Sequence, residues 1–367
     1  VSSTTANGTY KIGDVIAITV TFSEAVTVTG IPQLTLETGS TDAVVNYSSG
    51  SGSTTLTFNY TVASGHISSD LDYANTTALA LNSGTIKYAG GNNATLTLAS
   101  PGGSNSLGAN KALVVDGVAP SVSGVSISSA SGVQNSLLNA GDVVSVSATF
   151  SENVTKTGSP QLTLNVGGTN RTATYGSGSG GTSLVFQYTI QAGESDADGI
   201  SIGANALALN SGTIRDAAGN NATLTHSAVS ANASYKVDTT APTITITAAE
   251  GADGFTSSDG TLSLTFTSSE ATTNFAVGDI TINQGVLSNF SATSSTVYTA
   301  TFTPTANGAA TIDVAASTFT DAAGNNNTAA TQFNWTVNDI KAVSSTTANG
   351  TYKIGDVIAI TVTFSEA

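Results

Sequence analysis

The stretch YKIGDVIAITVTFSEA, residues 10–25, decides the fold of this chain. It contains a turn at Gly13-Asp14, a run of alternating apolar and polar residues, and Glu24 just past the predicted end of that run. Strict alternation is typical of a β-strand with one buried and one solvated face. The stretch therefore predicts one half-buried strand that ends in an acidic residue.

The same design recurs along the chain. It returns as LNAGDVVSVSATFSEN at residues 138–153 and more loosely as SSDGTLSLTFTSSEA at 257–271. Residues 14–98 align without a gap onto 142–226 at a constant offset of 128. Periods of this kind indicate tandem structural units.

The last 25 residues, Val343–Ala367, repeat Val1–Ala25 residue for residue. A sequence that restarts its own beginning indicates a window from a tandem array. Two strands alone are marginal in water. We therefore expect the array to continue past residue 367; the alternative is that another chain completes these strands by strand addition.

Short linkers divide the chain into units. They read VDGVAP at 115–120, VDTTAP at 237–242 and VNDIK at 337–341. The predicted domains are residues 1–117, 118–239 (a close repeat of the first), 240–339 (diverged), and 340–367 (the first strands of a further copy). Linkers this short that carry proline favour a semi-rigid string.

Composition narrows the function classes. The chain has 24 acidic and 9 basic residues, a net charge of −15, and no cysteine. This charge makes nucleic acid and anionic membrane surfaces poor partners and cations good ones. Without cysteine there is neither a disulfide nor a thiolate metal site. We expect no insertion into a membrane.

Every unit has a β pattern. In one strand of the first unit, Leu56, Phe58, Tyr60 and Val62 share a face, and turn residues recur about every ten positions. Such spacing predicts antiparallel β-sandwiches, here an all-β fold of tandem sandwiches in an elongated string.

Several motifs together resemble the bacterial immunoglobulin-like repeats of giant extracellular surface proteins and adhesins. They include GDVIAITVTFSEAV, PQLTLETGS, ALALNSGTI, DAAGNNATL and the linker VDTTAP. The resemblance implies an Ig-like fold, no catalytic activity, and a role as an extracellular stalk, adhesin or filament, often with calcium at domain junctions. The expected partners are neighbouring repeats of the array and other copies in a filament, at the bacterial surface or in a secreted filament.

In an Ig-like sandwich, loops from several strands meet at the pole where the chain enters. The glutamate just past the opening strand of each unit, the aspartate of DAAGN and the linker aspartate are therefore expected to converge at the junctions. Clustered carboxylates repel one another, and a hard cation relieves that repulsion. Because every candidate ligand is an oxygen, calcium fits better than zinc or copper. The predicted metal ligands are Asp116, Glu152 and Asp216; Asp238, Glu270 and Asp321; Asp70 and Asp198 from the opposite pole of the preceding unit; and Glu24, Asp339 and Glu366.

The first unit departs from this pattern, because Tyr88 stands where the second unit has Asp216. We expect weaker metal binding and a more flexible joint wherever the third domain is followed by a copy of the first domain. For any single aspartate, capping a turn is the simpler reading.

Two other function classes remain open. A ligand- or glycan-binding adhesion module would need exposed aromatic residues at one pole, and Tyr73 and Tyr88 are the nearest candidates. An enzyme is disfavoured, because neither His66 nor His226 has a partner pattern for catalysis.

Overall fold

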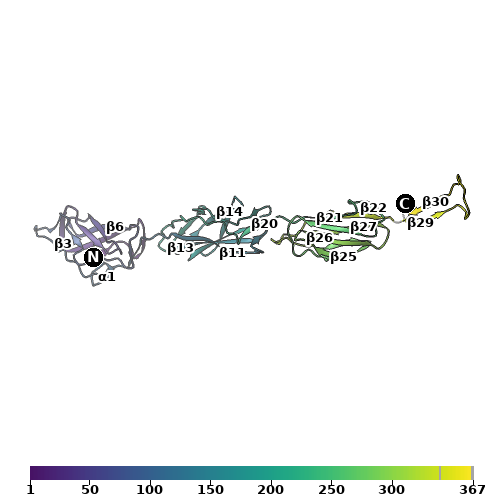
Figure 1. Cartoon of the computed structure of the whole chain (residues 1–367). Helices are drawn as coiled ribbons and strands as arrows, with labels where there is room; N and C mark the ends of the chain where they lie inside the picture. The colour runs from purple at the N-terminus through teal and green to yellow at the C-terminus, as the bar shows by residue number, and fades with distance from the viewer. Residues whose placement is uncertain (339, 365–367) are drawn as a thin grey trace.

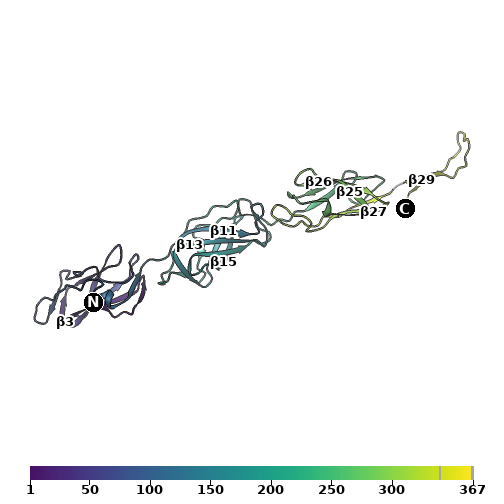
Figure 2. The same ribbon diagram turned by 90° about the horizontal axis from the view of Figure 1, so that it is seen from below.

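The computed structural model describes residues 1–338 and 340–364. The chain forms three elongated bodies arranged end to end, followed by a thin hairpin at the C-terminal end (Figure 1). The view turned by 90° shows the same single file (Figure 2). We call the bodies unit 1, unit 2 and unit 3, and the two places where they meet the first joint and the second joint.

Unit 1 contains two sheets. The larger has the strand order β1-β3-β6-β5-β4-β8, with β9 also paired to β3, and the smaller has the order β2-β10-β7. Its elements are β1 (Ser2–Ser3), β2 (Gly8–Lys11), β3 (Val15–Thr29), β4 (Gln33–Leu36), β5 (Ala43–Ser49), β6 (Ser53–Thr61), β7 (Ile67–Ser68), β8 (Leu79–Ala80), β9 (Thr85–Tyr88), α1 (Leu107–Asn110) and β10 (Leu113–Asp116).

Unit 2 repeats this topology, with the sheets β11-β13-β16-β15-β14-β18 (β19 paired to β13) and β12-β20-β17. Its strands are β11 (Val122–Ser131), β12 (Leu137–Leu138), β13 (Val143–Thr157), β14 (Gln161–Val166), β15 (Thr169–Ser177), β16 (Gly181–Thr189), β17 (Ser195–Asp196), β18 (Leu207–Ala208), β19 (Thr213–Arg215) and β20 (Lys236–Asp238).

Unit 3 is a pair of four-stranded sheets, β21-β23-β26-β25 and β22-β28-β27-β24. Its elements are β21 (Ile244–Ala248), β22 (Phe255–Ser257), β23 (Leu262–Ser268), the 3-10 helix η1 (Val277–Asp279), β24 (Ile280–Asn283), β25 (Gly285–Ala292), β26 (Val297–Pro304), β27 (Gly308–Val314) and β28 (Phe333–Val337). The terminal hairpin pairs β29 (Ile340–Ser345) with β30 (Ile360–Phe364).

Most strand pairs are antiparallel, but one pair in each unit is parallel: β2 with β10, β12 with β20, and β22 with β28. The first stretch of each unit crosses from one sheet to the other and lies beside the last strand. Because that last strand leads into the linker, this pair ties the entry of a unit to its exit.

Each unit buries its own apolar core between its sheets. The predicted face of the opening stretch is confirmed: Ile16 and Ile18 are fully buried, and Val20 and Phe22 nearly so. In unit 3, Trp335 is 1% exposed and lies in the core. Burial of this apolar surface is the main force that stabilises each sandwich.

The sequence predicted that the opening strand ends before Glu24, and this prediction is wrong. β3 continues to Thr29, and its ladder with β6 is broken between the pairs Thr21↔Thr55 and Val26↔Ser53. Past the break, β3 pairs with β9 instead. A bulge of this kind bends a strand, so Glu24 and its counterpart Glu152 lie on a bend at the end of the sandwich.

Candidate metal sites at the two joints

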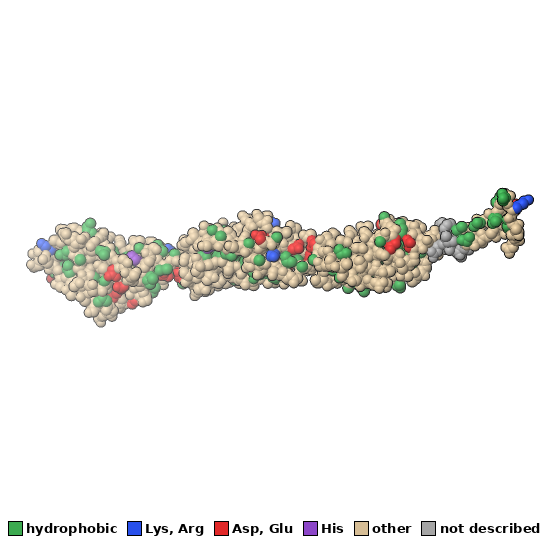
Figure 3. All heavy atoms as spheres, viewed as in Figure 1, with side chains coloured by type: hydrophobic (Ala, Val, Ile, Leu, Met, Phe, Trp, Pro, Cys, Tyr) green, Lys and Arg blue, Asp and Glu red, His purple; other side chains and the backbone are tan. Residues whose placement is uncertain are grey.

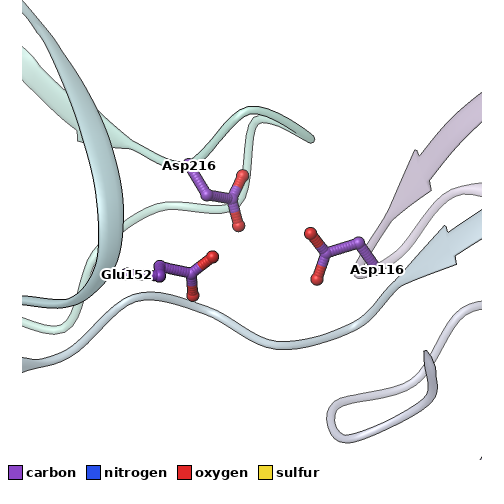
Figure 4. Close-up of side chains that lie close together, drawn as sticks. All are labelled: Asp116, Glu152 and Asp216. Carbon is purple, nitrogen blue, oxygen red and sulfur yellow. The ribbon is translucent and has the colours of Figure 1, made fainter. Parts of the chain in front are cut away.

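The first joint brings together three carboxylates from distant parts of the sequence. Asp116 ends β10 of unit 1, while Glu152 and Asp216 belong to unit 2. Each offers an oxygen, and these oxygens all lie within 4.8 Å of one another. The three side chains point toward a common space between the units (Figure 4). We call this set the first triad.

The second joint repeats the arrangement with Asp238, Glu270 and Asp321, whose oxygens also lie within 4.8 Å of one another. Asp238 ends β20 of unit 2, and the other two residues belong to unit 3. We call this set the second triad. Acidic side chains are visible at both narrow joints on the face shown in Figure 3.

The strand pattern places the glutamate of each triad. Glu152 lies where the ladder between β13 and β16 is interrupted, between the pairs Thr149↔Ser183 and Val154↔Gly181. Glu270 follows the end of β23 at Ser268. Both glutamates therefore leave the regular ladder at the end of the sandwich that faces the preceding unit.

The DAAGN turn places the aspartate. Asp216 is 4% exposed, and its Oδ1 accepts hydrogen bonds from the backbone N–H groups of Gly219 (2.6 Å) and Asn220 (2.8 Å). Gly219 has φ +94, a left-handed conformation that glycine adopts readily. Asp216 thus caps its own turn, as the simpler reading predicted, and the same carboxylate also borders the first triad.

An asparagine beside each triad connects the two units. Asn220 Nδ2 donates to Asp216 Oδ2 (2.8 Å) and to the backbone oxygen of Asp116 (2.9 Å). Its Oδ1 accepts from the backbone N–H of Ile12 in unit 1 (3.0 Å). Because the Asn220 amide is used in these bonds, the residue positions the linker aspartate.

The second joint uses the same device. Asn325 Nδ2 donates to Asp321 Oδ2 and to the backbone oxygen of Asp238, both at 2.9 Å. Two asparagines of unit 2 add bonds that the sequence did not predict: Asn135 Nδ2 donates to Ala322 O (2.8 Å) and Asn139 Nδ2 to Ala323 O (3.0 Å). Asparagine at turn positions was the only signal for them.

Burial and the neighbouring carboxylates raise the pKa of the glutamate in each triad. Burial, with Asp216 and Asp116 nearby, raises the pKa of Glu152 above its ordinary value. Burial, with Asp238 and Asp321 nearby, raises the pKa of Glu270 to about 7. Full ionisation of all three carboxylates is therefore unfavourable in each triad, which favours either a bound proton or a bound cation.

Other predicted ligands lie elsewhere. Asp70 and Asp198 are exposed and belong to neither triad, so their assignment to the joints is corrected. Their neighbours Asp72 and Asp196 are buried and accept backbone N–H groups within their own units. In each of these loops the neighbouring aspartate is the one that turns inward, while Asp70 and Asp198 face solvent.

The remaining predicted ligands are Glu24 of unit 1, Asp339 of the linker after unit 3, and Glu366 of the further copy of the first unit. Glu24 is exposed and joins no group of three acidic or histidine side chains in the described residues. Tyr88 pairs with Val26 in β9 and packs against the core of unit 1. Asp339 and Glu366 lie outside the residues that the structure describes.

The candidates for an aromatic binding platform are not free. Tyr73 is fully buried, and its hydroxyl donates to the backbone oxygen of Ala99 (2.6 Å). Each histidine has local hydrogen-bond partners: His66 Nδ1 lies 2.8 Å from the Tyr60 hydroxyl, and His226 Nε2 accepts from the backbone N–H of Ala206 (2.8 Å).

A family model described as a bacterial Ig-like domain matches residues 238–337. The third unit is a bacterial Ig-like domain. The matched range begins at Asp238 and contains the whole second triad. Together with the sandwich architecture of the other two units, the match confirms the predicted fold class of tandem Ig-like β-sandwiches.

Two solved structures show distant similarity. One is the Bacteroides ovatus mixed-linkage glucan utilization locus protein SGBP-B in complex with a mixed-linkage heptasaccharide, at 16% identity and TM-score 0.18, over 97% of this chain and 73% of that one. The other is Yersinia pseudotuberculosis InvD, at 16% identity and TM-score 0.24, over 60% of this chain and 59% of that one. At these identities and TM-scores, neither similarity assigns a function to this chain.

A comparison with curated proteins finds no match. The matched family model is that of an Ig-like domain and names no enzyme. Within the described residues, no helix is long and apolar enough to cross a membrane.

Proposed function

We propose that this chain is a non-catalytic structural segment of an extracellular bacterial stalk, adhesin or filament, and that calcium stiffens its joints. One observation carries the proposal: the same three-carboxylate arrangement occurs at both joints, and each triad takes ligands from two units. A cation held this way is bound only when the two units keep one relative orientation.

The donor set favours calcium. Every candidate ligand is a carboxylate oxygen, and the chain has no cysteine. Calcium accepts six to eight oxygen ligands in flexible geometry, whereas magnesium demands a near-ideal octahedron and keeps much of its water. Two carboxylates balance a divalent charge, so a bound cation offsets both the burial and the carboxylate repulsion that raise the pKa of Glu152 and Glu270.

The linear arrangement of the units supports a stalk. Each unit has its own core, and units contact only their neighbours (Figure 1). The stiffness of such an array depends on the nearest-neighbour joints. Extracellular calcium modules bind at about 10⁻⁴–10⁻³ M, and sites of that affinity are filled outside the cell and empty in the cytosol. The expected partners are the neighbouring units and other copies of the chain in a filament.

Calorimetric titration of the full chain with calcium tests the proposal. We expect two ions per chain, one per triad. Asp216→Asn should remove the first site alone and Asp321→Asn the second site alone, while Glu24→Gln should leave both intact. Absence of binding, or two sites that survive both substitutions, would contradict the proposed sites.

A further inference from the structure

Unit 1 contains a polar cleft that lies away from the joints' triads. It has a volume of about 620 Å³ and lies between β5 and β6. Those two strands pair only at Tyr47↔Phe58 and Ser49↔Thr57, so the edge of Ala43–Asn46 that faces β6 is unpaired, while its other edge pairs with β4. The strands therefore separate, and the volume falls in the range of roughly 300–1,000 Å³ typical of small-ligand sites.

Unit 2 closes the equivalent position with its own side chains. Arg171 stands at the position of Ala43: Arg171 pairs with Leu164 as Ala43 pairs with Leu36. Its Nε lies 2.5 Å from Glu194 Oε1, and Glu194 is the counterpart of His66 at the offset of 128. The arginine side chain thus runs from the Ala43 position to the His66 position, across the space that is open in unit 1.

Strand pairing agrees with this difference. In unit 2 the ladder between β15 and β16 includes Thr174↔Gln187. The counterparts of these residues are Asn46 and Asn59, which line the cleft of unit 1 and are not paired to each other in its ladder. Unit 1 lacks both members of the Arg171–Glu194 ion pair, and its strands separate one residue pair earlier.

His66 presents a donor at the inner wall of the cleft. Its Nδ1 accepts from the backbone N–H of Ala63 (3.3 Å) and lies 2.8 Å from the Tyr60 hydroxyl. A nitrogen that accepts a backbone N–H carries no proton, so the proton of the neutral ring is on Nε2. Glu194 accepts the corresponding loop N–H and tyrosine hydroxyl in unit 2 as a carboxylate.

The two asparagines of the cleft add one donor and one acceptor. Asn46 Oδ1 accepts from Gln33 Nε2 (2.9 Å), which leaves the amide N–H groups of Asn46 for a ligand. Asn59 Nδ2 donates to Ser48 Oγ (3.0 Å), which leaves Asn59 Oδ1 as an acceptor. Asp42 is the single carboxylate that lines the cleft. The lining thus mixes donors and acceptors and carries little charge.

We propose that this cleft binds a neutral saccharide. A hydroxyl group both donates and accepts, so adjacent sugar hydroxyls match alternating donors and acceptors such as Asn46, Asn59 and His66. An anion would face Asp42 and a chain of net charge −15. A guanidinium would lack the carboxylate that holds Arg171 in unit 2. The site is independent of calcium and goes beyond the proposed stiffening of the joints.

The imidazole signals of the full chain test the proposal, because the chain has only two histidines. The probes are maltotriose, cellotriose, mannotriose and chitotriose, each titrated while proton NMR follows both rings. We expect at least one saccharide to shift the His66 signals and to leave His226 unchanged. Ala43→Arg keeps His66 and fills the cleft, so the affinity for that saccharide should fall at least tenfold.

A second variant protects the test against misfolding. Ala43→Arg with His66→Glu installs the pair that unit 2 already uses, so the sandwich is expected to keep its thermal unfolding temperature. Calorimetry should show that binding of the saccharide is lost in this variant. The proposal is overturned if no probe shifts His66, if the double variant binds as tightly as the parent chain, or if L-arginine shifts His66 while the saccharides do not.

Discussion

Glu270→Gln should change the stability of unit 3 in opposite directions with and without calcium. The pKa of Glu270 is raised from 4.5 to about 7, which means that the folded protein resists ionisation of this group. The corresponding stability is present below pH 4.5 and is lost as the pH rises through about 7. At pH 8 without calcium, Glu270 is therefore a charge that destabilises the folded state.

The expected size follows from the shift. A shift of 2.5 pH units corresponds to roughly 3.4 kcal/mol at most, and partial exposure reduces it, so we expect Glu270→Gln to stabilise calcium-free unit 3 by about 1–2 kcal/mol at pH 8. Calcium at 100 times its Kd stabilises the folded parent chain by about 2.7 kcal/mol. The variant has lost one of three ligands and should gain much less.

Urea unfolding followed by tryptophan fluorescence measures this directly. Trp335 is the single tryptophan of the chain and lies in the core of unit 3, so its signal reports on that unit alone. With a chelator the variant should be more stable than the parent, and with calcium the order should reverse. Glu24→Gln, the equivalent change in unit 1, should leave the stability of unit 3 unchanged both with the chelator and with calcium. A variant that is less stable than the parent in both conditions would refute the reasoning.

Three further predictions concern the second joint and the core of unit 3. Calcium affinity at the second joint should fall roughly 25-fold between pH 7.5 and 5.5, because binding requires Glu270 to lose its proton. Calorimetry of the Asp216→Asn chain isolates this joint, and a calcium affinity that does not change with pH would contradict the prediction. Asn325→Ala should weaken the contact between units 2 and 3 by about 1–2 kcal/mol, because it removes the hydrogen bond to the Asp238 backbone oxygen. Asn92→Ala, the equivalent change in unit 1, should leave that contact unchanged, and calorimetric unfolding compares the two variants. Phe275→Ala should destabilise unit 3 by about 3–5 kcal/mol, because its ring packs against four other aromatic rings; a loss below 1 kcal/mol in urea unfolding would be inconsistent with that packing.

Strand faces and the approach of the carboxylates follow from local pattern and topology. Alternation in the opening stretch correctly predicted its buried face, because the two-residue period of a strand fixes which side chains enter the core. Repetition of that stretch, together with the DAAGN turn, was enough to place Glu152, Asp216 and Asp116 at one joint. Whether they bind calcium remains a prediction.

Contacts that depend on tertiary detail did not follow from the sequence. Like the triad residues, Asp70 and Asp198 are acidic residues in loops, and only the folded structure shows that they belong to neither triad. The bridging role of Asn220 depends on a partner 104 residues away, the backbone of Asp116. The cleft of unit 1 becomes visible only when Ala43 is compared with Arg171 in an aligned register.

Distances between spin labels across each joint test the central claim most directly. The chain has no cysteine, so Ser49→Cys with Ser126→Cys spans the first joint, and Ser126→Cys with Ser288→Cys spans the second; all three serines are exposed. We predict a narrow distance distribution in calcium that broadens with a chelator, and a broad distribution in both conditions for Asp216→Asn at the first joint and Asp321→Asn at the second. Distributions that are equally narrow with calcium and with chelator would contradict the account.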